Sequence, residues 1–264
     1  VLGARIVFAH LAVVAIVLTA LRSRMQESTL WEQAVAMRQA AGATLAEQSM
    51  AASVSELFSA RNVKAMVFLI AMYGLWNLWA GTNGFFFPYI LRTVGSQTQA
   101  ASVGLQAAGF TVSMLSIGLV FMRLADRVNQ RLLFLAAALI QVVGMSLLAL
   151  FPLTMPLAIL HVFLMQFGGG FGAQSFFQLW SAELFPTLQR ATAQGVTFAV
   201  VRIGLGLWSF FVPVLTATGF TTLAWILTGF LVASALVGLI WAPRHEGKTL
   251  EQIQLERTRG RQPA

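Results

Sequence analysis

The chain has 264 residues, of which 58% are hydrophobic and only 10% are charged. Soluble domains carry about 25% charged residues, so this composition excludes an ordinary soluble domain and indicates that lipid surrounds much of the chain. The net charge of +8 would suggest nucleic acid as the partner of a soluble protein, but membrane topology accounts for it better, and no nucleic-acid partner is expected. Cysteine is absent, which excludes disulfides and thiolate chemistry, and the three histidines show no metal-ligand spacing.

The start of the chain lies inside an apolar run. Val1 is preceded by no basic region, and no small-residue cleavage site follows, so no signal peptide is expected. An internal start of this kind indicates a fragment of a longer protein; a non-standard start codon is the alternative.

Seven apolar stretches reach roughly the 20 residues that a helix needs to cross the hydrocarbon core. They cover residues 3–21, 65–91, 98–122, 132–151, 154–180, 192–217 and 221–242. The runs are too long for strands and do not alternate, and helices satisfy every backbone polar group in lipid. We therefore predict an all-α membrane protein with seven transmembrane helices.

The segment 22–64 differs from these stretches. It mixes charged residues with Ala, Leu and Met at helical spacing, which predicts one or two short amphipathic helices at the membrane surface. If this segment is cytoplasmic, almost all Lys and Arg fall on that side, and the opposite side holds only Arg92 and Arg5. This bias predicts a multi-pass protein of the plasma (inner) membrane, with its N-terminus outside and its C-terminus in the cytoplasm.

Four motifs resemble the sugar porter branch of the major facilitator superfamily, and they occur in that family's order. Residues 24–31 resemble the Pro-Glu-Ser-Pro-Arg-Trp-Leu sequence after the family's sixth helix, with Gln26 and Thr29 in place of the prolines. Residues 126–131 resemble its Asp-Arg-x-Gly-Arg-Arg loop, from which Asn129 and Gln130 depart.

The other two motifs lie near the end of the chain. Residues 183–190 closely match the family's Glu-hydrophobic-Phe-Pro…Arg motif, and residues 243–251 resemble its Pro-Glu-Thr-Lys-Gly…Leu-Glu tail. Each motif alone is only moderately specific, but all four in order favour the resemblance strongly.

The resemblance implies a domain organisation for the chain. Residues 1–21 would be the family's sixth helix, 22–64 the cytoplasmic linker, 65–242 the C-terminal six-helix bundle and 243–264 a cytoplasmic tail. The N-terminal half of the usual twelve-helix transporter would be the missing partner. Because substrates of this fold bind between the two halves near the midplane, the chain would present half of a site.

Two asparagines in the second span are candidate substrate ligands. Asn83 matches the family's Gly-x-Asn, whose Asn binds sugar hydroxyls, and Asn77 falls on the first residue of its preceding Gln-Gln pair. The second residue of that pair is Leu78, so one amide is lost. The alternative is that both amides only join neighbouring helices.

Two glutamines in the fifth span are further candidates. Gln174 and Gln178 share a helix face by their spacing of four residues, and Gln178 stands where sugar porters place a Trp that stacks on the sugar. Amides donate to and accept from hydroxyls or carboxylates. Interhelical bonding is the alternative, at about 0.6 kcal/mol per bond.

Arg202 lies about ten residues into the sixth span. A central Arg costs about 2.5–3.5 kcal/mol on insertion scales and is a functional candidate by default, here as a ligand for an anionic group. Snorkelling to the interface is the alternative. No Asp or Glu lies inside a predicted span, so a carboxylate for coupling to protons would come from the missing half.

Five charged residues lie where spans meet the cytoplasm. In the family, such charges form a network that holds the cytoplasmic side closed. Topology explains the arginines but not the acids, because Asp and Glu contribute little to orientation. The predicted gating network consists of Asp126, Arg127, Arg131, Glu183 and Arg190.

Other polar and small residues have structural interpretations. Gln106 and Gln141 are single amides, which predicts hydrogen bonds between helices. Gly168, Gly169, Gly170 and Gly172 predict close helix packing and not a phosphate loop, because the preceding strand and the following lysine are missing.

The sequence thus predicts the C-terminal portion of a secondary transporter that moves a small polar solute, a sugar or polyol, by alternating access, without a cofactor or a metal. An organic-acid transporter is the alternative, favoured by Arg202 and by the lost Gln-Gln pair. A seven-helix receptor or sensor is a rival of another class, against which the tail and the linker argue. An enzyme is not expected, because no acid, base and nucleophile cluster at membrane depth.

Overall fold

The computed structural model describes residues 2–25, 31–32, 35–36 and 58–243. The predicted amphipathic linker and the predicted tail fall largely outside these residues. The chain divides into two units, residues 1–48 and 49–264, and each is described by itself.

The first unit contains α1 (Leu2–Ser23), a helix of 22 residues. At about 1.5 Å per residue it is long enough to cross a bilayer. Its described side chains from Arg5 onward are exposed and mostly apolar around the whole helix, as expected for a surface in contact with lipid.

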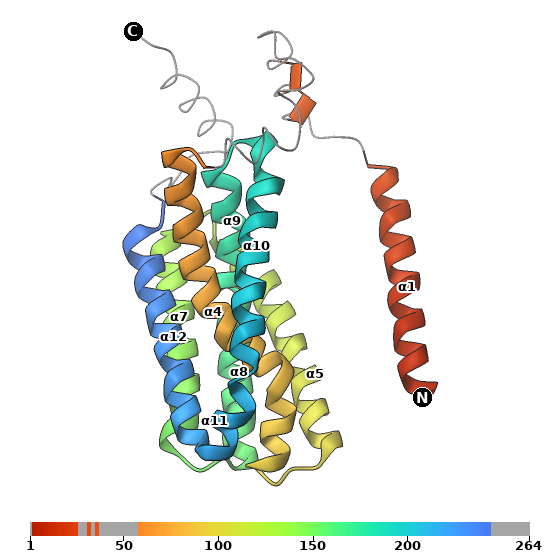
Figure 1. The fold of residues 1–264 in the computed structure, drawn as a ribbon, viewed down its shortest axis with the longest axis vertical. Helices are drawn as coiled ribbons and strands as arrows, with labels where there is room; N and C mark the ends of the chain where they lie inside the picture. The colour runs from red at the N-terminus through yellow and green to blue at the C-terminus, as the bar shows by residue number, and fades with distance from the viewer. Residues whose placement is uncertain (1, 26–30, 33–34, 37–57, 244–264) are drawn as a thin grey trace. The chain divides into compact units, whose positions relative to one another are not determined.

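The second unit is a bundle of helices that run up and down one common axis (Figure 1). Its longest helix is α4, and η1 is a π-helical turn between α5 and α6. The elements are α4 (Ala60–Thr93), α5 (Gln99–Ser116), η1 (Ile117–Phe121), α6 (Met122–Leu124), α7 (Gln130–Leu150), α8 (Met155–Gly170), α9 (Ala173–Leu184), α10 (Thr187–Ser209), α11 (Val212–Thr218) and α12 (Phe220–Trp241).

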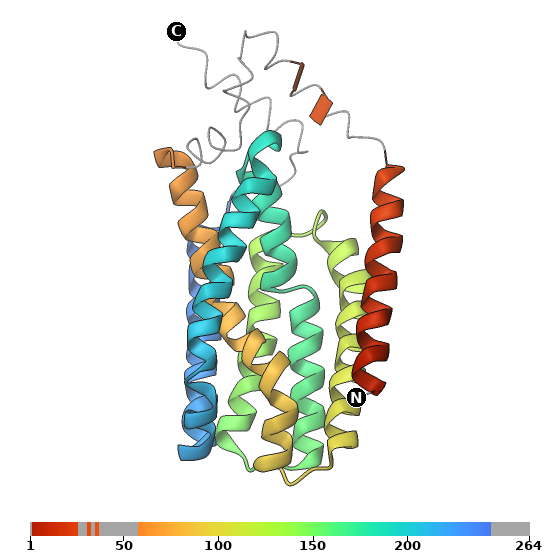
Figure 2. The same ribbon diagram turned by 45° about the vertical axis from the view of Figure 1, so that its right-hand side comes forward.

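The helices pack in a defined order. α12 packs against α7 and α4, α8 lies between α5 and α7, and α10 packs against α4 (Figure 2). Large aromatic side chains fill the core beside α9, where Trp180 lies 4.8 Å from Phe176 and 5.3 Å from Phe134 between ring centroids. Exposed apolar side chains such as Leu236 and Ile240 cover the outside, which suits a lipid environment.

The fifth predicted span is interrupted in the structure. Residues 154–180 were expected as one helix, but α8 ends at Gly170 and α9 starts at Ala173. The reason is the glycine-rich sequence here, since glycine is a poor helix former. Ser175 Oγ donates to the Gly170 carbonyl at 2.7 Å, which satisfies one backbone group at the break.

Within the described residues, six helical stretches are long and apolar enough to cross a membrane. They include α1, α7 and α12, the stretch from α5 to α6, and α8 with α9 as one crossing. The sixth is α4. This confirms the all-α membrane fold. The predicted span 192–217 forms α10 and α11; α10 has 23 residues but is more polar, so this seventh crossing stays a prediction.

Candidate functional site

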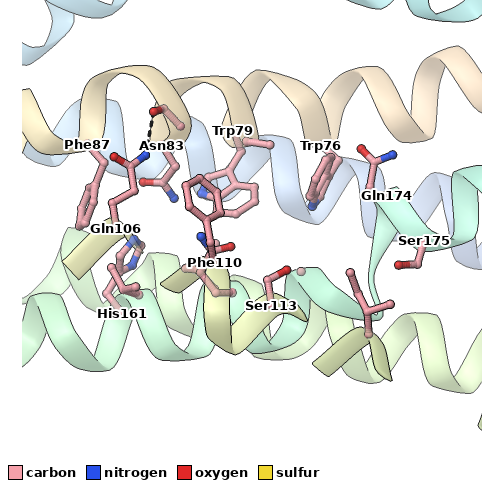
Figure 3. Close-up of a pocket in the computed structure, with 17 residues that line it drawn as sticks. Trp76, Trp79, Asn83, Phe87, Gln106, Phe110, Ser113, His161, Gln174 and Ser175 are labelled. Carbon is pink, nitrogen blue, oxygen red and sulfur yellow. Dashed lines mark hydrogen bonds between the residues drawn. The ribbon is translucent and has the colours of Figure 1, made fainter. Parts of the chain in front are cut away.

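A cavity of about 240 Å³ lies between α4, α5, α8 and α9 (Figure 3). Helical periodicity brings its wall residues together, because side chains three and four positions apart lie on one face. The main wall residues from α4 are Trp76, Trp79, Asn83 and Phe87; those from α5 are Gln106, Phe110 and Ser113, and Ile117 follows at the start of η1.

The break between α8 and α9 shapes the far end of this cavity. The Gly172 amide donates to the Gly169 carbonyl at 3.3 Å, so the chain turns before α9 begins. Gln174 and Ser175, in the first turn of α9, then line the same cavity as Asn83. The glycine run therefore positions polar side chains as well as packing closely.

Gln141 on α7 supports the cavity wall from behind. It is 1% exposed; its Oε1 accepts from Trp76 Nε1 at 3.1 Å, and its Nε2 donates to the Met165 carbonyl at 3.3 Å. One amide thus joins α7 to α4 and α8. The predicted interhelical role of Gln141 is confirmed.

Gln106 makes a similar connection on the other side. Its Nε2 donates to the Gly84 carbonyl at 2.8 Å, which ties α5 to α4 and confirms the predicted interhelical bond (Figure 3). Gln106 also lines the cavity, so the same side chain holds two helices and presents a polar edge to the interior.

The four predicted amide ligands do not all lie in the cavity. Asn83 and Gln174 line the cavity. Asn77 is 3% exposed and interacts with the Tyr73 hydroxyl, which donates to Gln174 Oε1 at 2.7 Å. Gln178 does not line the cavity; it is exposed, and its Oε1 accepts from Gln194 at 3.3 Å. Asn77, Asn83 and Gln174 thus lie in or beside one site, and Gln178 lies apart from it.

Arg202 is exposed on α10 and is not part of the cavity wall. The cavity wall has 17 residues, and none of them is Asp, Glu, Lys or Arg. A solute inside this cavity would therefore meet amides, hydroxyls and aromatic rings but no ionised Asp, Glu, Lys or Arg.

The wall residues that sequence reasoning missed include Trp76, Trp79, Phe110 and His161. A signal was present on α4, where Trp76, Trp79, Asn83 and Phe87 recur at helical spacing around a recognised ligand candidate. No comparable signal singled out His161, because its place in the wall depends on how α8 packs against α4 and α5.

The predicted gating residue Glu183 lies in the last turn of α9 and is 6% exposed. Its Oε1 accepts from Gln130 Nε2 at 3.2 Å, and Gln130 Oε1 accepts from Trp180 Nε1 at 2.8 Å. Gln130 is therefore a bridge to Glu183 that the family motif did not indicate, because that loop has Arg at its place.

The other predicted gating residues contact the backbone or solvent. Arg190 donates to the Ala182 carbonyl at 2.8 Å, and Arg131 donates to the Ala242 carbonyl. Asp126 and Arg127 are exposed. Within the described part of the chain, no ion pair joins the five gating residues, and Glu183 Oε2, Arg131 Nε and Arg190 Nε are buried without a hydrogen-bond partner.

The described residues offer no metal site, since no three His, Cys, Asp or Glu side chains cluster in them.

The family model for "Sugar (and other) transporter" matches residues 3–256. The chain belongs to the sugar transporter family. It is 40% identical over 256 residues to the minor myo-inositol transporter IolF of Bacillus subtilis, an alignment that covers 97% of this chain and 58% of that relative. It is 24% identical over 196 residues to the glucose transporter GlcP of Staphylococcus epidermidis, which covers 70% of this chain and 43% of that relative.

The chain thus spans about half the length of the curated relatives it matches. The predicted resemblance to the C-terminal half of a sugar porter is confirmed, and with it the assignment to a multi-pass membrane protein of a transporter family.

Proposed function

We propose that this chain forms the C-terminal portion of a secondary transporter that moves a small neutral polyol or sugar by alternating access. The observation that carries the proposal is the cavity wall, which combines aromatic rings with the Asn83 and Gln174 amides and has no Asp, Glu, Lys or Arg side chain. Amides bind hydroxyl groups as both donors and acceptors, and apolar walls with few polar groups are typical of small-molecule sites. The relation to a myo-inositol transporter supports the same class.

The rest of the transporter is part of this proposal. Its N-terminal half would close the site from the opposite side, because solutes of this fold bind between two halves. In that complete site, Gln178 and Arg202 are the exposed candidates to face the second half. Any coupling to protons would use a carboxylate from that half.

The charged end of the bundle would act as the cytoplasmic gate. Glu183, Arg131 and Arg190 each keep a buried polar atom without a partner in this conformation. Such atoms cost about 1–3 kcal/mol each, so a state that pairs them would gain stability. Rocking of the two halves would make and break these pairs.

Uptake measurements test the proposed transport. Vesicles that contain the chain together with the N-terminal half of the Bacillus relative should accumulate labelled myo-inositol saturably, and neutral polyols or sugars should compete. The chain alone should not, because half a site cannot alternate access. Competition by organic acids and not by neutral polyols would support the carboxylate alternative through Arg202, and saturable uptake by the chain alone would contradict the requirement for two halves.

Single cysteines test the proposed orientation in this cysteine-free chain. Basic residues predict that Ser23 faces the cytoplasm, and alternation of the helices then places Thr154 outside. Both side chains are exposed. A membrane-impermeant thiol reagent should label Thr154→Cys but not Ser23→Cys in intact cells, and both after permeabilisation. The opposite pattern would invert the topology.

A further inference from the structure

Two buried nitrogen atoms in the cavity wall have no hydrogen-bond partner among the described protein atoms. They are Nε1 of Trp79 on α4 and Nε2 of His161 on α8, and the two residues are 4% and 1% exposed. Both line the same cavity (Figure 3). The neighbouring Trp76 differs, because its indole nitrogen already donates to Gln141. Since most buried polar side-chain atoms have partners, these two require an explanation.

The contacts of His161 determine what its free nitrogen can do. Its Nδ1 lies 2.8 Å from the Gly144 carbonyl of α7. A carbonyl oxygen only accepts, so Nδ1 carries the hydrogen, and in the neutral imidazole Nε2 is then an acceptor. The Phe87 ring packs against the imidazole at 5.2 Å between centroids and holds the ring in the wall.

The indole nitrogen of Trp79 has the opposite character, because an indole N–H only donates. The cavity therefore holds one free donor and one free acceptor on different helices. A hydroxyl group can serve either atom, since it donates one hydrogen bond and accepts others. An ionised carboxylate can serve Trp79 but has no hydrogen for His161.

We propose that Trp79 and His161 are substrate contacts that bind hydroxyl groups of a neutral polyhydroxylated ring, Trp79 as the donor and His161 as the acceptor. This assignment rests on the proposed transport function. It adds two residues to which the resemblance to sugar porters assigned no role. It also predicts discrimination against acids at this contact, because a carboxylate at His161 would place two acceptors against each other.

Both nitrogens are covered in this conformation, so the wall must adjust when a solute enters. Phe110 on α5 lines the same cavity and is 60% exposed, so its side chain can rotate with little loss of packing. Solute binding would then replace a covered, unpaired nitrogen by a hydrogen-bonded one, which favours the bound state.

Matched substitutions test the two contacts in vesicles that carry the chain with the N-terminal half of the Bacillus relative. Trp79→Phe keeps the ring and removes the N–H. His161→Asn keeps a donor for the Gly144 carbonyl and removes the acceptor at the Nε2 position. Each should weaken competition by myo-inositol about two- to tenfold, the value of one neutral hydrogen bond. Trp225→Phe on α12 is the control, because Trp225 is exposed and does not line the cavity.

Analogues of myo-inositol with single deoxy or fluoro replacements identify the contacts. Each variant should bind one deoxy analogue as well as it binds myo-inositol. That analogue lacks the hydroxyl that would have bonded to the atom removed by the substitution. A fluoro group accepts weakly but cannot donate. The parent should therefore tolerate fluorine better in place of the hydroxyl that accepts from Trp79 than in place of the hydroxyl that donates to His161. Trp225→Phe should keep the parent's analogue profile.

The possible outcomes separate the two proposals. If the parent pair takes up no polyol, the proposed function fails and this assignment fails with it. If the parent transports and both variants keep its affinity and analogue profile, the two nitrogens are structural or bound to water, and only this assignment is overturned. If His161→Asn does not fold, Trp79→Phe and its control still decide for the donor.

Discussion

Gly170→Ala is expected to destabilise the bundle by about 1–3 kcal/mol, the usual cost of overpacking a close contact. A Cβ at Gly170 would lie 2.7 Å from the Ser113 carbonyl and 2.6 Å from Ser116 Cβ on α5. The carbonyl is a backbone atom and cannot rotate away. Ser116 Oγ also donates to the Phe167 carbonyl at 2.6 Å, so the two helices are joined where the methyl group would enter.

Gly104→Ala on α5 is the matched control. A Cβ there meets nothing within 4 Å, and alanine is the better helix former by about 1 kcal/mol, so this variant should be neutral or slightly more stable. The measurement is the free energy of unfolding of both purified variants in the same detergent. Equal stabilities would show that α5 and α8 do not approach each other as closely as described.

Gln141→Leu is expected to cost about 1–3 kcal/mol, because it leaves the N–H of the partly buried Trp76 without its partner. The smaller average of about 0.6 kcal/mol for hydrogen bonds in membranes applies where the freed group finds another partner. Here the amide bonds to two helices and is 1% exposed, so another partner is difficult to reach.

A double-mutant cycle decides between these two magnitudes. Trp76→Phe removes the donor that Gln141→Leu would leave unpaired, and removal of both partners is often nearly neutral. The double variant should therefore be more stable than the sum of the two single losses predicts. Simple additivity would show that the bond between Trp76 and Gln141 contributes nothing to stability.

The glutamines show where sequence reasoning succeeded. Gln106 and Gln141 were predicted to join helices, and both do, because a single amide in an apolar span needs a partner and the nearest polar groups are on neighbouring helices. Gln174 and Gln178 were expected to act together from one helix face. Both lie on α9 after the break, but only Gln174 and Ser175 of that helix line the cavity, and Gln178, one turn further along, is exposed near Gln194.

The sequence by itself determined the fold class, the approximate bounds of the helices and the transporter family. Apolar run length is a local property, and four ordered motifs carry the resemblance to the sugar transporter family, so neither needs knowledge of packing. The tertiary structure alone decided which polar atoms share a cavity and which remain unpaired. Trp79 and His161 are 82 positions apart in the numbering, and only the packing of α4, α5 and α8 brings both into one wall with an unpaired donor and an unpaired acceptor. Hydrogen-bond satisfaction depends on neighbours across helices, which no spacing along one helix can specify.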